Sequence, residues 1–67
     1  MFEYSILIQY NKEENIYIAS IPEIEGCMAD GKTPEDAIEE LKITFQLFIE
    51  VAKEKGYNIP QPVLYVS

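Results

Sequence analysis

Hydrophobic and polar residues alternate at the start of the chain, with the period of two that is typical of a strand with one face on a core. The apolar positions are Phe2, Tyr4, Ile6, Ile8 and Tyr10, and only Leu7 interrupts the polar positions between them. Their aromatic and β-branched side chains are also those that strands favour. We therefore predict a strand over residues 2–10.

A second apolar run, Ile16 to Ile21, follows a charged turn at residues 11–15 and stops before Pro22. The short spacing between the two runs favours an antiparallel hairpin. In the second run both alternating sets of positions are fairly apolar. This predicts a strand that is covered on both sides, or one that lies at an oligomer contact.

The next segment indicates a short strand, a tight turn and one long helix. Residues 27–29 are the strand, and Gly31 in the turn can take a positive φ at no steric cost. Thr33 is a good N-cap residue, and Pro34 suits the first helical position because its missing N–H has no partner there. Gly56 is expected to end the helix in a left-handed conformation.

Within this helix the apolar residues form two stripes. The first is predicted to face the core and contains Ala37, Ile38, Leu41, Phe45, Phe48, Ile49 and Ala52. The second contains Ile43, Leu47 and Val51, which are spaced by four and lie beside the first. A helix on one small sheet needs a stripe of only about 100°. The excess favours contact with another chain, and the alternative is cover by the C-terminal tail.

The tail predicts an extended entry at Pro60 and Pro62, followed by a fourth strand over residues 63–66. Its Val63, Leu64 and Tyr65 join the second helix stripe as candidate oligomer-interface residues. The predicted fold class is α+β in the order β-β-β-α-β. We expect an antiparallel sheet of three to four strands with one helix packed on one face, in a single domain over residues 1–67.

The composition limits how this chain can be stabilised and which kinds of partner it can bind. A chain of 67 residues is marginal alone, and with one cysteine and no histidine it has neither an internal disulfide nor a usual zinc site. We expect no cofactor, and stability from a partner chain. The net charge is −7, from 12 acidic residues and 5 lysines. This disfavours direct nucleic-acid binding and fits a basic partner, although solubility is an equally good reason. With neither a membrane span nor a secretory signal, we expect a cytoplasmic location.

Catalytic chemistry finds little support in the sequence. The absence of histidine removes Ser-His and Cys-His pairs, and Cys27 has acidic neighbours rather than the positive ones that activate a thiol. Glu23, Glu25 and Asp30 flank the third strand, but no acid projects from the middle of the first two strands to complete a metal site. We predict that the chain is not an enzyme, and that these acids are solvated or contact a protein.

One run of residues resembles a known family. It contains Pro22, Glu23, Ile24, Gly26, Cys27, Ala29, Gly31, Thr33, Glu35, Asp36 and Ala37, and Pro60 falls in a tail of the same kind. Through this run and this tail the chain resembles the HicB-like antitoxin family, and the resemblance covers nearly the whole chain. The structural motif residues carried by the resemblance are Pro22, Gly26, Cys27, Gly31, Thr33, Ala37, Gly56 and Pro60.

The resemblance implies a partial ribonuclease H-like fold without nuclease activity. It also implies that the chain binds HicA, a small basic mRNA-degrading toxin, and masks its active site. Many members carry a further DNA-binding domain, which we do not expect in this chain. We assign Glu23, Glu25 and Asp30 as toxin contacts from their charge alone. The alternative is a stand-alone homo-oligomer, a dimer or tetramer, that acts as a scaffold or binds a small ligand.

Overall fold

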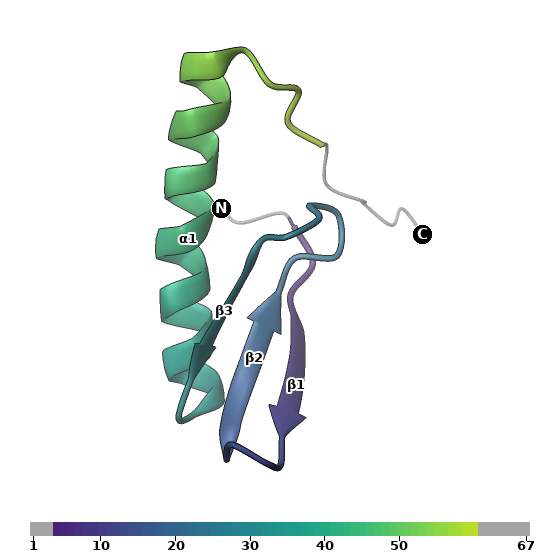
Figure 1. The fold of residues 1–67 in the computed structure, drawn as a ribbon, viewed down its shortest axis with the longest axis vertical. Helices are drawn as coiled ribbons and strands as arrows, with labels where there is room; N and C mark the ends of the chain where they lie inside the picture. The colour runs from purple at the N-terminus through teal and green to yellow at the C-terminus, as the bar shows by residue number, and fades with distance from the viewer. Residues whose placement is uncertain (1–3, 61–67) are drawn as a thin grey trace, which may run out of the picture.

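The computed structural model of the chain describes residues 4–60. Three strands precede one helix in the described part: β1 (Leu7–Asn11), β2 (Ile16–Ser20), β3 (Met28–Gly31) and α1 (Pro34–Lys55) (Figure 1). The strands form one antiparallel sheet in the order β1-β2-β3. This confirms the predicted α+β class.

The predicted fourth strand over residues 63–66 lies outside the described residues.

The β1–β2 hairpin is closed by side chains of its own turn. The Asn11 Oδ1 atom accepts hydrogen bonds from the N–H groups of Glu13 and Glu14, at 3.1 and 3.3 Å. Tyr10 lies opposite Tyr17 in the register, with the two ring centroids 5.0 Å apart. The Tyr10 hydroxyl also donates to Oδ1 of Asn15, at 2.8 Å. The charged turn that the sequence predicts is therefore held by local polar contacts.

Two details of the first predicted strand were wrong. β1 begins at Leu7, so residues 4–6 of the predicted strand lie outside it, and the Ser5 N–H donates to a carboxylate instead of joining a strand ladder. Residues 2 and 3 of that prediction lie outside the described residues. Tyr10 is 52 % exposed although it shares a sheet face with Ile8. The helix packs mainly on β3 and β2, so the turn end of β1 lies beyond its cover.

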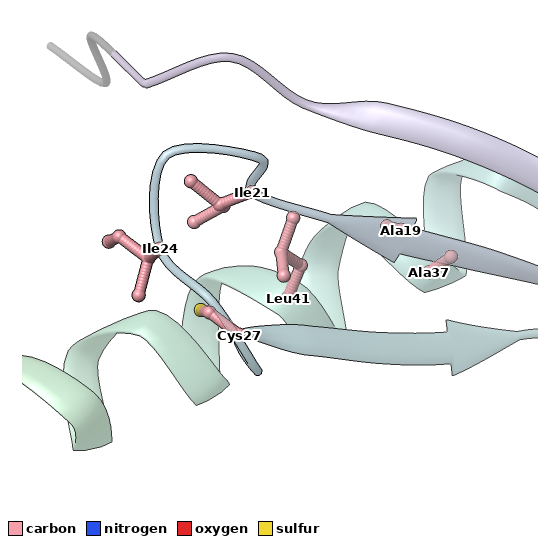
Figure 2. Close-up of a cluster of buried hydrophobic side chains, with 6 residues drawn as sticks. All are labelled: Ala19, Ile21, Ile24, Cys27, Ala37 and Leu41. Carbon is pink, nitrogen blue, oxygen red and sulfur yellow. The ribbon is translucent and has the colours of Figure 1, made fainter.

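The core lies between α1 and the facing side of the sheet. Six buried residues form its centre, namely Ala19, Ile21, Ile24, Cys27, Ala37 and Leu41 (Figure 2). Tyr4, Ile6, Ile8, Tyr17, Ala29, Phe45 and Phe48 pack around them. The alternation predicted for the start of the chain is therefore right for Ile6 and Ile8, which turn toward this cluster.

Residues 21–27, which we call the arch, connect β2 to β3 and supply half of the central core (Figure 2). The N–H of Ile21 donates to the Cys27 carbonyl at 3.1 Å, and the N–H of Ile24 donates to the Ile21 carbonyl at 3.0 Å. The N–H of Cys27 in turn donates to the Ile24 carbonyl at 3.2 Å. These bonds satisfy the backbone and let Ile24 point inward. Cys27 belongs to the arch rather than to the strand predicted at residues 27–29, since β3 starts one residue later.

Both helix ends follow the sequence prediction. The Thr33 hydroxyl accepts a hydrogen bond from the Asp36 N–H at 3.1 Å, and Pro34 occupies the first turn. Gly56 ends the helix with φ of 74°, and its N–H donates to the Ala52 carbonyl. These local signals, a cap and a left-handed glycine, are enough to set the ends of α1.

The reason predicted for Gly31 was wrong. Its φ is not positive; among the glycines, only Gly26 and Gly56 have positive φ angles, of 84° and 74°. A Cβ atom on Gly31 would lie 2.5 Å from the backbone nitrogen of Ala37 and 2.8 Å from the carbonyl carbon of Asp36. The end of β3 therefore approaches the first turn of α1 so closely that only a glycine fits.

Candidate protein-binding site

The three acids predicted as toxin contacts have different surroundings. Glu23, on the arch, is half-buried, and its two carboxylate oxygens accept from the Ser5 N–H at 3.2 and 3.1 Å. The Ser5 hydroxyl also lies 3.1 Å from Oε2 of Glu23. Glu23 thus ties the segment before β1 to the arch. Glu25 is exposed on the arch, and Asp30 is exposed on β3.

The structure groups Asp30 with residues of β2 and the hairpin turn instead of with the arch acids. Asp30 lies opposite Ile18 in the register, and Met28 lies opposite Ser20. Because side chains alternate along a strand, these positions share the sheet face that points away from α1. Sequence reasoning did not find this grouping, because it depends on the pairing register of β2 with β3.

This face contains a groove of about 320 Å³, which we call the outer-face groove. Its lining residues are Glu14, Ile16, Ile18, Met28, Ala29 and Asp30. Met28 is 55 % exposed. The groove therefore combines apolar side chains with two carboxylates. The sequence signal for it was that residues 16–21 are apolar at both alternating sets of positions, which predicted a strand covered on both sides or one at an oligomer contact.

The second apolar stripe of the helix is exposed, as its predicted role requires. Ile43, Leu47 and Val51, which we call the outer helix stripe, are 53, 57 and 45 % exposed. At ~100° per residue they lie roughly 80–160° around the helix from the buried Leu41. The remaining predicted interface residues, Val63, Leu64 and Tyr65, lie outside the described residues.

Several predicted motif residues have structural roles. Ala37 is fully buried beneath the sheet, and Pro22 is the second residue of the arch. The Pro60 carbonyl accepts a hydrogen bond from the Tyr4 hydroxyl, and the Tyr4 ring packs on Phe45 with centroids 5.1 Å apart. The start of the chain and the segment after the helix are thereby joined.

The chemistry of Cys27 agrees with a structural role. The thiol is buried in the core, and loss of solvation raises its pKa above the ordinary value. A raised pKa lowers the fraction of reactive thiolate. Within residues 4–60, no group of three or more histidine, cysteine or acidic side chains could hold a metal ion. The helix of the described part is also too polar to cross a membrane.

Comparisons with known proteins identify the family. The model of the HicB-like antitoxin of bacterial toxin–antitoxin systems matches residues 4–65. A UPF0150 protein of Synechocystis sp. is 39 % identical over 57 residues, which cover 85 % of this chain and 77 % of the relative. A UPF0150 protein of Thermoplasma acidophilum is 29 % identical over 59 residues, covering 88 % and 84 % of the two chains.

A UPF0150 protein of Helicobacter pylori is 37 % identical over a shorter segment of 38 residues, covering 57 % of this chain and 53 % of the relative. No solved structure matches the chain at a comparable level of significance. The family match spans almost the whole sequence and includes the arch, the helix and both of its ends. The chain therefore belongs to the HicB-like antitoxin family of bacterial toxin–antitoxin systems.

Proposed function

We propose that this chain binds and neutralises a small basic HicA-type toxin by protein–protein contact and without catalysis. The observation that carries the proposal is the combination of antitoxin-family membership with a net charge of −7. A toxin that degrades mRNA needs a cationic surface to hold the phosphate backbone. An acidic chain is attracted to that surface and competes for it. Because the substrate of such a toxin is mRNA, we expect the complex to form in the cytoplasm.

The test first looks beside the gene of this chain for a reading frame that encodes a short basic protein. We expect that protein to stop growth when it is expressed alone, and co-expression of this chain to restore growth. In vitro, the purified chain should block mRNA cleavage at one-to-one ratios, and the association rate should fall as salt is raised. Unchanged mRNA cleavage in the presence of excess chain would refute the proposal.

The outer helix stripe supports a second candidate, a stand-alone homo-oligomer that acts as a scaffold or small-ligand binder. Ile43, Leu47 and Val51 remain about half exposed. A chain this small gains little stability from its own core, so burying these side chains against another copy would stabilise it. Fully burying a leucine side chain is worth roughly 1.5–3 kcal/mol, so covering the exposed half of Leu47 contributes about 1 kcal/mol per copy. We propose a dimer or tetramer assembled through this stripe.

Light scattering and sedimentation at micromolar concentration test this assembly. We expect Leu47→Lys to dissociate it, because the substitution places a charge in the contact. Gln46→Lys adds the same charge to the neighbouring exposed position and should leave the assembly intact. A monomeric wild-type chain at this concentration, or equal effects of both substitutions, would exclude the stripe as the interface.

A further inference from the structure

The helix covers only one face of the sheet, and the other face carries a concentration of apolar side chains. Ile16, Ile18 and Met28 from two neighbouring strands line the outer-face groove. Single exposed apolar residues are common on protein surfaces and need no explanation. Three that share one concave site are the pattern expected of a binding surface.

Two carboxylates give this groove its charge. Glu14 reaches it from the hairpin turn and Asp30 from β3. Both residues are exposed, and within residues 4–60 neither is joined to a lysine by a salt bridge. An anionic occupant would be repelled by both groups. A cationic occupant would pair with them while its apolar part contacts the isoleucines and Met28.

Lysine and arginine side chains have this composition. Each carries an aliphatic stem that packs on apolar surface and a charged head that binds carboxylates. We propose that the outer-face groove docks an apolar segment of a basic protein partner, with a lysine or arginine side chain between Glu14 and Asp30. The inference rests on the proposed function, since it locates part of the surface on which the basic toxin is bound.

A second copy of this chain is a poor occupant of the groove. A twofold contact through this face would bring the two copies of Glu14 and Asp30 toward one another. Like charges at an interface are unfavourable. The groove is therefore unfavourable for contact between two copies, unlike the outer helix stripe, whose three residues are uncharged.

The probe for the groove is the peptide acetyl-Leu-Arg-Leu-Arg-Leu-Arg-amide, titrated into the isotope-labelled chain and followed by NMR. The same peptide with glutamine in place of arginine is the charge control. We expect the methyl signals of Ile16, Ile18 and Met28 to shift with the arginine peptide. The double variant Glu14→Gln, Asp30→Asn should bind it about tenfold more weakly, since two partly exposed ion pairs are lost.

A matched variant separates local contacts from the general attraction of an acidic chain. Glu39→Gln with Glu54→Gln removes two exposed acids of α1 and gives the same net charge of about −5. Its affinity for the peptide should stay within about twofold of the wild type, since only screened long-range attraction is lost. Equal weakening by both double variants would overturn the inference. Methyl shifts centred outside the groove would do the same, as would proton–proton contacts that place residues 61–67 or a second copy in it.

The toxin assay distinguishes failure of this inference from failure of the proposed function. If Glu14→Gln, Asp30→Asn neutralises the toxin as well as the wild type does, the groove is not the docking site and the proposed function stands. If the wild type fails to neutralise any basic neighbour, the proposed function falls. The peptide titration then still decides whether the groove binds cationic segments.

Discussion

Substitution of Gly31 by alanine tests the close approach of β3 to the first turn of α1. The added Cβ would lie 2.5 Å from the Ala37 nitrogen and 2.8 Å from both the carbonyl carbon and the Cβ of Asp36. Two of these three atoms belong to the backbone in the first turn of α1, where rotation of a side chain cannot relieve the clash. Either the end of β3 or the start of the helix must move.

The expected cost follows from two opposing effects. Overpacking of a well-packed site destabilises by about 1–3 kcal/mol. Replacing glycine by alanine also restricts the unfolded chain, which favours folding by roughly 0.4–1 kcal/mol. The clash is the larger effect, and the net loss should be about 1–2 kcal/mol. A domain of this length has about 3–10 kcal/mol of total stability, so the Tm should fall by roughly 5–15 °C.

Thermal and urea unfolding followed by circular dichroism measure this loss, and asparagine variants identify its cause. At Gly56, where φ is 74°, asparagine should be tolerated better than alanine because it adopts left-handed conformations more readily. At Gly31 the larger asparagine should be worse than alanine. The close-packing explanation is refuted if Gly31→Ala is as stable as the wild type. It is also refuted if asparagine is the better residue at Gly31.

Three further measurements follow from the core and the helix cap. Leu41→Ala removes a fully buried side chain and should cost about 2–5 kcal/mol, measured as a lower midpoint of urea unfolding followed by circular dichroism. Thr33→Ala should cost about 1 kcal/mol in urea unfolding and Thr33→Ser much less, because the hydroxyl that accepts from the Asp36 N–H is kept. Burial raises the pKa of the Cys27 thiol, so the neutral thiol favours the fold below the ordinary thiol pKa and this contribution is lost as pH rises through the raised value. Thiol labelling of Cys27 should therefore stay slow at mildly alkaline pH until denaturant is added, and rapid labelling of the folded chain would contradict its burial.

Local signals in the sequence were sufficient for the helix and for the general order of elements. Thr33 and Gly56 act on their own backbone neighbours, so their spacing predicts both ends of α1 without knowledge of the rest of the fold. The period of two at the start of the chain likewise predicted which face of β1 carries Ile8. Exposure of the outer helix stripe was also predictable, since helical spacing fixes its angle from Leu41.

The parts that sequence reasoning missed depend on contacts between distant residues. The inward position of Ile24 requires the hydrogen bonds that close the arch, and the late start of β1 requires Glu23 to meet Ser5 across 18 positions. Nothing near Gly31 in sequence distinguishes a turn glycine from one pressed against a helix. Similarly, Glu14 and Asp30 line the same groove only because of the register in which β2 pairs with β3, and the sequence pattern does not determine that register.

The two candidate surfaces belong to different layers of a two-layer domain, and this arrangement bears on how they would work together. The outer helix stripe belongs to the helix layer, and the outer-face groove lies on the far side of the sheet. Packed layers are spaced by about 10 Å, so the two surfaces share no side chains and substitutions in them should act independently. Assembly through the stripe would leave every groove open. Several grooves on one oligomer would then hold a multivalent basic partner more tightly than one groove alone, without any new contact.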